Sequence, residues 1–316
     1  MNTLYAIGEM LIDFTAQEPG VLELANTFRK NAGGAPANVA VCAARLGCPA
    51  SVITKLGKDP FGNFLANTLA SENVGTQYVF RTGKANTALA FVARDERGER
   101  SFSFYRNPSA DMLLEEEEVR TIPFKEGDIL HFCSVDLCDA PVRLAHVVAI
   151  ERARAAGALV SFDPNLRYNL WESAEELLRV VREFLPLADI VKVSDEELLD
   201  ITGIEDEKEA VRSLMKGEVK LVFVTKGKGG AAAYTKDTEA WEPTDLNSPV
   251  VDTTGAGDSF IGTILSLILE KGIELSREDL SEMLKTANRA ATIVVSREGA
   301  IPAMPTRAEL YGEDKA

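Results

Sequence analysis

The 316-residue sequence is poor in the residues on which metal, disulfide and nucleic-acid sites depend. It contains only two histidines and four cysteines, and 49 acidic residues outnumber 34 basic ones, for a formal net charge of −15. Because nucleic-acid binding depends on basic surfaces, this balance argues against it. Cys133 and Cys138 lie near His131 in the sequence, but their spacing is not that of a zinc knuckle and their neighbours are apolar. We therefore interpret the cysteines as reduced core thiols of a cytosolic protein.

Long apolar runs and leader sequences are missing too. The longest strongly apolar stretch, Ile261 to Leu269, is about half of a membrane span. The N-terminal segment has no basic leader, and Glu9 and Asp13 interrupt its apolar residues. We therefore expect a cytoplasmic protein that does not bind membranes. The sequence also lacks the G-x₄-G-K-[ST] motif, which excludes a P-loop nucleotide site.

Strand-like and helix-like segments alternate along the chain, which predicts an α/β fold with a mostly parallel sheet and helices on both faces. Strands are predicted at Leu4–Ile7, Leu11–Phe14, Ser51–Leu56, Ile129–Phe132, Leu159–Phe162, Ile190–Val193 and Leu221–Thr225, and helices at Ala35–Leu46, Phe61–Asn73, Val142–Ala156 and Ala174–Phe184.

Two segments, 13–31 and 86–106, break this alternation, since they show turn signals and polar–apolar alternation but no helix. The second is predicted to be a hairpin with its tip at Asp95–Gly98. An antiparallel insertion of this kind predicts a lid over the strand ends, where open α/β sheets bind ligands. Residues 1–316 are therefore interpreted as one domain that carries this lid.

The segment 250–260 is the most informative, because a strand end there meets a Gly-rich turn and the start of a helix. Gly255, Ala256 and Gly257 allow close backbone approach, and the free N–H groups of the helix end form an anion site. Asp258 lies in the first helical turn, where it would repel a resting phosphate. We interpret Asp258 as the base for a hydroxyl that attacks phosphorus. The alternative is an ordinary helix start with a carboxylate on the dipole.

A base at a helix N-terminus is expected to be weak, since the dipole favours its charged form. This is sufficient for phosphoryl transfer, whose loose transition state needs positioning and charge stabilisation more than a strong base.

A dinucleotide site is an alternative for the glycines near residue 227. Residues 221–232 satisfy G-x-G-x-x-A, but a second strand, not a helix, is predicted after the glycines, so we reject a Rossmann dehydrogenase.

Six motifs, in order from about residue 4 to residue 305, resemble those of the ribokinase-like (pfkB) carbohydrate kinases. They are Gly33–Asn38, Asp59–Gly62, Asp163–Arg167, Ser194–Glu197, Thr225–Gly230 and Asp252–Asp258. The resemblance implies a ribokinase-like three-layer sandwich with a mostly parallel central sheet. It also implies a small β-sheet lid over the sugar that serves as a homodimer contact.

The resemblance implies two sets of ligand-binding residues. The sugar side is expected at Asp13, Gly33, Gly34, Asn38, Arg106 and Arg167, the two arginines serving the substrate or the moving phosphoryl group. The ATP side is expected at Lys192, Ser194, Thr225, Lys226, Gly227, Gly230 and Asn288, the last near adenine. Lys226 could alternatively be a solvated side chain. The alternative for Asp163 and Asn165 is that they simply fix a turn.

Metal ions enter through the same resemblance. Glu197 is expected to position Mg²⁺ through water, because Mg²⁺ keeps much of its hydration shell when it bridges phosphates. The alternative is that Glu196 and Glu197 only begin a helix. Asp252 and Thr254 resemble the family's potassium loop, although Ala303 replaces its serine ligand, so modest K⁺ stimulation is expected.

The substrate is the least determined feature. The segments Ala32–Asn38 and Glu99–Leu114 and the pair Leu170–Trp171 look most like the family's fructokinases. They imply phosphorylation of D-fructose on its 6-hydroxyl by MgATP. The nearest alternative is 2-keto-3-deoxygluconate kinase, which uses a pair like Tyr105–Arg106. A non-catalytic sugar or nucleotide sensor is disfavoured, because a sensor does not need Asp258 or the turn at Gly255–Gly257.

Overall fold

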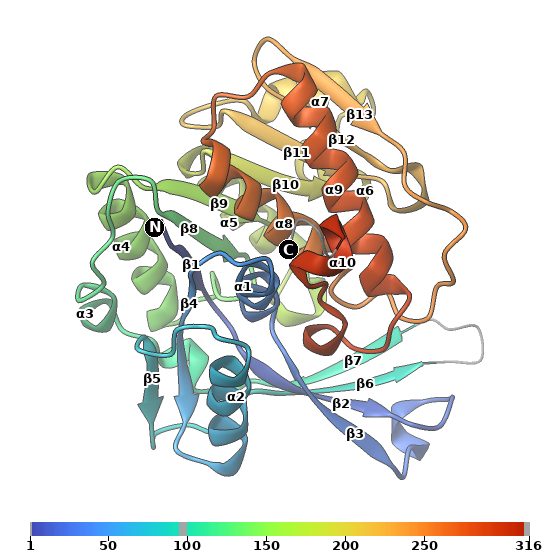
Figure 1. The fold of residues 1–316 in the computed structure, drawn as a ribbon. Helices are drawn as coiled ribbons and strands as arrows, with labels where there is room; N and C mark the ends of the chain where they lie inside the picture. Colours follow the sequence, from blue (N-terminus) through green and yellow to red (C-terminus); the bar gives the residue numbers. More distant parts are fainter. Residues whose placement is uncertain (1, 95–99, 313–316) are drawn as a thin grey trace.

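The computed structural model describes residues 2–94 and 100–312, so the predicted hairpin tip at Asp95–Gly98 lies outside it (Figure 1). Nine of the described strands form the main sheet. In spatial order they are β13 (Glu239–Glu242), β12 (Ala231–Tyr234), β11 (Leu221–Thr225), β10 (Ile190–Ser194), β9 (Leu159–Asp163), β8 (Ile129–Cys133), β1 (Leu4–Ile7), β4 (Ala50–Gly57) and β5 (Val79–Thr82). From β5 to β11 all pairs are parallel, and β12 and β13 join antiparallel at one edge.

The mostly parallel sheet is therefore confirmed, and its strands show why the sequence predicts it. Successive residues of a strand point to opposite faces, and on β1 Leu4 and Ala6 join one buried apolar cluster while Tyr5 and Ile7 join another. Both faces are thus covered, as the predicted three-layer sandwich requires.

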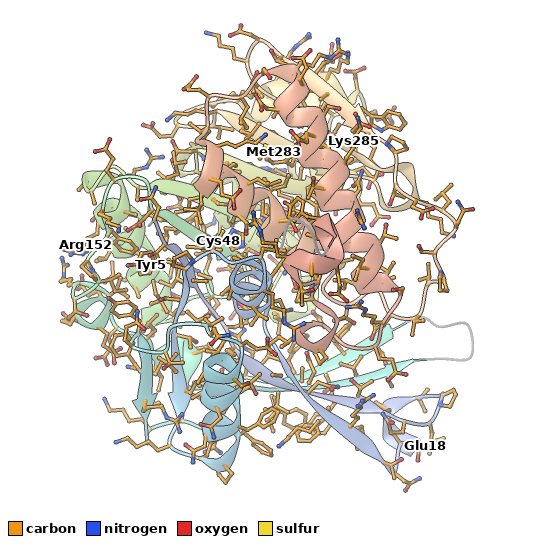
Figure 2. The ribbon with its side chains drawn as sticks, viewed as in Figure 1. Tyr5, Glu18, Cys48, Arg152, Met283 and Lys285 are labelled. Atoms are coloured by element: carbon orange, nitrogen blue, oxygen red, sulfur yellow. The ribbon has the colours of Figure 1, made fainter. Side chains whose placement is uncertain are left out.

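Helices cover each face of the main sheet (Figure 1). One cluster contains residues of α1 (Ala35–Arg45), α2 (Pro60–Ser71), α8 (Ala256–Lys271), α9 (Arg277–Val295) and α10 (Arg307–Tyr311), and the other contains residues of α3 (Glu116–Val119), α4 (Pro141–Ala155), α5 (Ala174–Phe184), α6 (Asp195–Thr202) and α7 (Glu207–Leu214). Figure 2 labels two residues of α9 that show its amphipathic character: Met283 is buried in the core, whereas Lys285 is mostly exposed. Among the described helices, none has the length and apolar character of a membrane span.

A smaller four-stranded sheet extends away from the main body, and Figure 2 places Glu18 at its far end. Its order is β3 (Phe28–Gly33), β2 (Leu11–Ala16), β6 (Leu89–Arg94) and β7 (Arg100–Tyr105). The β2–β6 pair is parallel and the outer pairs are antiparallel. One detail of the sequence prediction is wrong, since segment 13–31 contains a short 3₁₀ turn at Leu22–Leu24.

One helix contact fixes the position of the two N-termini on which the site depends. Helix α8 lies so close to α1 that a Cβ on Gly262 would lie 2.8 Å from the Cβ of Cys42. Residues four positions apart share a helix face. One turn earlier on each helix, the same faces therefore bring Asp258 against Asn38.

Candidate active site

Polar residues gather where neighbouring parallel strands end. Asp163, Ser194 and Thr225 are the last residues of β9, β10 and β11, and Ser194 lies directly opposite Thr225 in the register. The carboxyl edge of a parallel sheet is where open α/β folds bind ligands. The site described below is built along this edge.

Asp258 is held by Asn38 at the N-terminus of α8. The Asn38 Nδ2 atom donates to Asp258 Oδ2 at 2.7 Å, and the α8 N-terminus has Gly255 at its cap with φ 80° and no side-chain cap. Burial raises the pKa of Asp258 above its usual value, while the Asn38 hydrogen bond and the charges of Lys192 and Arg167 oppose the rise. The sequence predicts a weak base because the helix dipole favours the charged form. The structure instead gives a raised pKa, because the loss of solvation exceeds the stabilisation of the charged form.

Lys192 supplies a buried positive charge beside the α8 N-terminus. Its Nζ lies 3.0 Å from Asp163 Oδ2 in an ion pair buried at both ends, and 3.1 Å from where a Cβ on Gly257 would be. Burial alone would lower the pKa of Lys192, but Asp163 and Glu197 raise it above its usual value, so the ammonium stays charged. A glycine at 257 therefore gives this cation access to the anion site.

Asp163 has a structural and an electrostatic role together. Its Oδ1 accepts the backbone N–H of Asn165, which has φ 46°, so the carboxylate fixes the turn as the simpler interpretation proposed. Burial raises the pKa of Asp163 to about 6 despite Lys192, and Glu197 adds to the rise. The group remains ionised at neutral pH.

Glu197 caps its own helix. Its Oε2 accepts the N–H of Ser194, whose hydroxyl accepts the N–H of Glu197, and its Oε1 accepts the N–H of Leu166 at 2.8 Å. The helix-start alternative thus describes its local structure correctly. Each carboxylate oxygen has a second lone pair, so these bonds leave Glu197 able to accept from water that surrounds a cation.

The loop before α8 is tied to the chain that follows α9. The Asp252 carboxylate accepts from the N–H and hydroxyl of Thr254 at 2.9 and 2.7 Å, and from the N–H of Gly299 at 3.2 Å. A Cβ on Gly255 would lie 3.0 Å from Ala300. Asp252 and Thr254 therefore shape the loop that presents the α8 amides.

On the sugar side, Asp13 lies over the glycines that precede α1. A Cβ on Gly33 would be 2.0 Å from Asp13 Oδ2, so a side chain there would displace this carboxylate. A cavity of about 610 Å³ separates the small sheet from the main body; its lining includes Asp13, Thr254 and Glu298 but not Asp258. Arg29 of β3 and Glu298 form an exposed ion pair across it at 2.5 Å.

The two predicted arginines differ in their surroundings. Arg167 is exposed, and its charge lowers the pKa of Asp258. Arg106 is only 9% exposed, and its guanidinium binds Asp111 at 2.5 Å and also Asp136. The structure therefore brings Arg167 to the site, whereas it holds Arg106 in a buried carboxylate cluster.

Four of the predicted ATP residues, Thr225, Lys226, Gly227 and Gly230, lie in or beside the turn between β11 and β12. The turn is a short 3₁₀ segment, Gly227–Gly229, and the Nε1 of Trp241 donates to the Gly229 carbonyl at 3.2 Å. A Cβ on Gly230 would lie 2.2 Å from the Glu242 carbonyl oxygen, which requires glycine there. A strand follows this turn, as predicted, so the unit is not a dinucleotide fold.

Two other predicted ATP residues are already engaged within the protein. Lys226 Nζ lies 2.7 Å from Glu207 in a partly exposed ion pair, so its charge is already partnered within the protein. Asn288 donates from Nδ2 to the carbonyl oxygens of Glu242 and Pro243 at 3.0 and 3.1 Å. Its amide therefore fixes the backbone that flanks the glycine turn.

Sequence reasoning missed Glu9 and Asp136 and the partnership of Asp163 with Lys192. Glu9 is noticed only as an interruption of an apolar run, and no motif marks Asp136. The available signal is that charged residues occur inside segments that otherwise read as buried, and such residues need a partner.

An anion site at a helix N-terminus, a buried lysine and a carboxylate, all at the edge of a parallel sheet beside a small β-sheet, together define the ribokinase-like class of carbohydrate kinases. Comparison with known proteins supports this class. A family model for the pfkB family carbohydrate kinases matches residues 1–307, and the chain belongs to this family.

Several relatives match over nearly the whole chain. Probable fructokinase-2 of Arabidopsis thaliana is 45% identical over 309 residues, which cover 96% of this chain and 93% of that protein. The fructokinase of Vibrio cholerae O395, solved with fructose, ADP and calcium, has a TM-score of 0.89 at 34% identity and 98% coverage of both chains. The fructokinase of Xylella fastidiosa with bound ATP has a TM-score of 0.87 at 37% identity and covers 98% of this chain, with 96% of its own covered.

The Asn38–Asp258 hydrogen bond predicts a pH effect. Asn38→Ala removes a donor that lowers the pKa of Asp258. Asp258 should then need a higher pH to ionise, so the acid limb of the kcat profile should move to higher pH. Asn63→Ala, at an exposed residue of α2, is the control and should leave the profile unchanged. An unshifted acid limb in Asn38→Ala would show that Asp258 does not govern it.

Proposed function

We propose that the chain transfers the γ-phosphoryl group of ATP to the 6-hydroxyl of D-fructose, with Asp258 as general base. The observation that carries this proposal is Asp258 itself, held by Asn38 in the first turn of α8. Support comes from the relatives, which are named fructokinases, and from the Vibrio protein, whose structure contains fructose and ADP.

In this mechanism Asp258 orients the sugar hydroxyl and accepts its proton. A pKa raised by burial makes it a better acceptor than an ordinary aspartate, while the charges of Lys192 and Arg167 favour its ionised form. The turn Gly255–Gly257 at the α8 N-terminus and the Lys192 ammonium, 3.1 Å from where a Cβ on Gly257 would be, are proposed to stabilise the oxygens on which charge develops. Asp13, Gly33 and Gly34 contact the sugar hydroxyls. Arg167 is placed to offset phosphoryl charge.

ATP and Mg²⁺ fit the residues that surround this centre. Thr225, Gly227 and Gly230 offer a hydroxyl and backbone amides to the nucleotide. Asp163, Glu197 and Asp258 all act on Lys192 electrostatically, so carboxylates outnumber this buried cation, and a divalent ion restores the balance. Glu197 would hold Mg²⁺ through water, and the ion would supply positive charge to offset that of the phosphates.

Replacing the base provides the most direct test. Asp258→Asn should lower kcat by about 10²–10⁴-fold, the usual contribution of a positioned base, with ATP and sugar affinities changed by only a few-fold. Asp279→Asn is a matched control, because Asp279 holds the same third position in α9 and caps Ser276. Near-normal turnover in Asp258→Asn would reject the mechanism and leave the helix-start interpretation.

The contacts of Arg106 bear on the choice between a neutral sugar and a keto acid as the substrate. The keto-acid alternative assigns Arg106 to the substrate carboxylate, but Arg106 already binds Asp111 and Asp136. We therefore propose that the site selects a neutral sugar. Arg106→Ala is a poor probe of this point, because removing one partner of a buried ion pair costs about 3–5 kcal/mol in stability.

A substrate panel tests the choice of sugar without a mutation. We expect kcat/KM for D-fructose to exceed that for 2-keto-3-deoxygluconate and for aldoses in a coupled ADP-release assay. A higher value for the keto acid would overturn the assignment while leaving the kinase mechanism in place. No sugar-dependent ATP turnover with any member of the panel would favour the sensor alternative.

A monovalent cation is proposed beside the Asp252–Thr254 loop. This loop is held to the Gly299 backbone and supports the α8 N-terminus, so a bound K⁺ would stiffen the anion site. We expect modest stimulation of kcat by K⁺ relative to tetramethylammonium at equal ionic strength. Identical rates in the two salts would exclude the cation.

The small sheet is proposed to act as a lid and as a dimer contact. Val21, Leu24, Phe102 and Tyr105 are exposed large apolar residues in or beside it. We expect sedimentation equilibrium to give twice the chain mass, and Leu24→Glu to weaken the dimer. Leu144→Glu, at an exposed position of α4, is the control. A monomer at micromolar concentration would contradict the proposal.

A further inference from the structure

A buried charge cluster lies at the base of the small sheet, behind the sugar-side residues. Arg106 leaves the end of β7, Glu9 lies between β1 and β2, and Asp136 follows β8. Glu9, Asp111 and Asp136 are 4%, 1% and 1% exposed, so three carboxylates and one guanidinium share this interior. The proposed mechanism uses none of the three carboxylates.

The cluster contains three carboxyl groups and one guanidinium, so its positive charge cannot neutralise three ionised carboxylates. Arg106 bonds Asp111 and Asp136, and Ser109 also donates to Asp111. Glu9 Oε2 and Asp136 Oδ2 are buried and have no hydrogen-bond partner among the described residues. An unpartnered buried carboxylate oxygen is costly when charged. The cluster is therefore expected to keep a proton.

Glu9 is the acid from which this proton is lost near neutral pH. Burial raises its pKa to about 7, although Arg106 and the Ala35 amide oppose the rise and Asp111 adds to it. Burial also raises the pKa of Asp136 well above its usual value. The thiols that face the cluster, Cys133 and Cys138, have pKa values raised by burial and stay neutral, so they do not compete for this role.

Glu9 is connected directly to the sugar side. Its Oε1 accepts the N–H of Ala35, the first residue of α1, at 3.1 Å. Its own carbonyl oxygen lies 2.4 Å from where a Cβ on Gly34 would be, so Glu9 and Gly34 are in close backbone contact. Gly33 lies beneath Asp13, and Asn38 is one helical turn further along α1.

We propose that Glu9, in its neutral form, is a positioning residue for the sugar: it holds the α1 N-terminus that presents Gly33, Gly34 and Asn38. Loss of its proton adds a negative charge to a cluster whose single guanidinium is already paired with Asp111 and Asp136, and the resulting repulsion displaces this end of α1. Sugar affinity then falls as pH rises, while ATP affinity, which depends on the other end of the site, does not. This inference rests on the proposed fructokinase activity.

The test compares the pH dependence of the two Michaelis constants. For the wild type, KM for fructose should rise between about pH 6 and 9, by up to tenfold per pH unit above the pKa of one controlling group, while KM for ATP stays level. Glu9→Gln, which remains neutral, should keep KM for fructose level. Asp128→Asn removes a buried carboxylate that accepts from Thr3 and Lys125 at the opposite edge of the sheet, and should retain the wild-type profile.

A second measurement does not depend on turnover or on the variant. Calorimetric titration of fructose into the wild-type protein at about pH 8, in buffers of different ionisation enthalpy, should show proton uptake on binding, and none at about pH 6. A pH-independent KM for fructose, no proton uptake, or a wild-type slope in Glu9→Gln would each overturn the role of Glu9. No fructose phosphorylation by the wild type at pH 6 would instead reject the proposed function.

Discussion

The contact between the N-terminal halves of α1 and α8 is the constraint on which the site depends. Gly262 lets the two helices approach until Asn38 reaches Asp258 at 2.7 Å. The two helices bring different functions, since α1 follows the glycines beside Asp13 and α8 begins at the anion site. A side chain at 262 would separate sugar from phosphate, because close-packed helices do not absorb an added methyl group without shifting. The distance between the reacting groups is thus set in the core.

Carboxylates that lose solvent, one at the end of β9 and one in the first turn of α8, are unfavourable for stability and useful for chemistry. Asp163 and Asp258 have pKa values raised chiefly by burial, and each is offset by Lys192. A carboxyl group whose pKa is raised by folding stabilises the folded state most at pH values below its ordinary pKa. This stability is lost as the pH rises through the folded-state pKa, which is about 6 for Asp163. The Lys192 ammonium opposes the rise in both pKa values and so favours the ionised form of each carboxyl group. The same charge lies beside Gly257, where incoming phosphate oxygens gain from it.

The sequence predicts most of the fold, because its strands are buried on both faces and therefore form continuous apolar runs. Leu4–Ile7, Leu221–Thr225 and Ala174–Phe184 agree with the structure residue for residue. The helix start that carries Asp258 also lies where the contiguous motif predicts it, whereas the roles assigned to this turn stay predictions. Side-chain partners are less readable: Lys226 pairs with Glu207, and Arg106 with Asp136, across long separations in sequence. Nothing in local spacing distinguishes an arginine that meets a ligand from one that meets a buried carboxylate.

These pairings explain how the site handles phosphate without a P-loop lysine. Lys226 immediately precedes the glycine turn but pairs with Glu207, so the turn offers backbone and hydroxyl groups rather than charge. Positive charge comes instead from Lys192, Arg167 and the α8 N-terminus, which all surround Asp258. In the proposed mechanism these cations surround the base that receives the sugar proton. Because transition-state charge is what catalysis must stabilise, charge placed there would act on the reacting phosphoryl group.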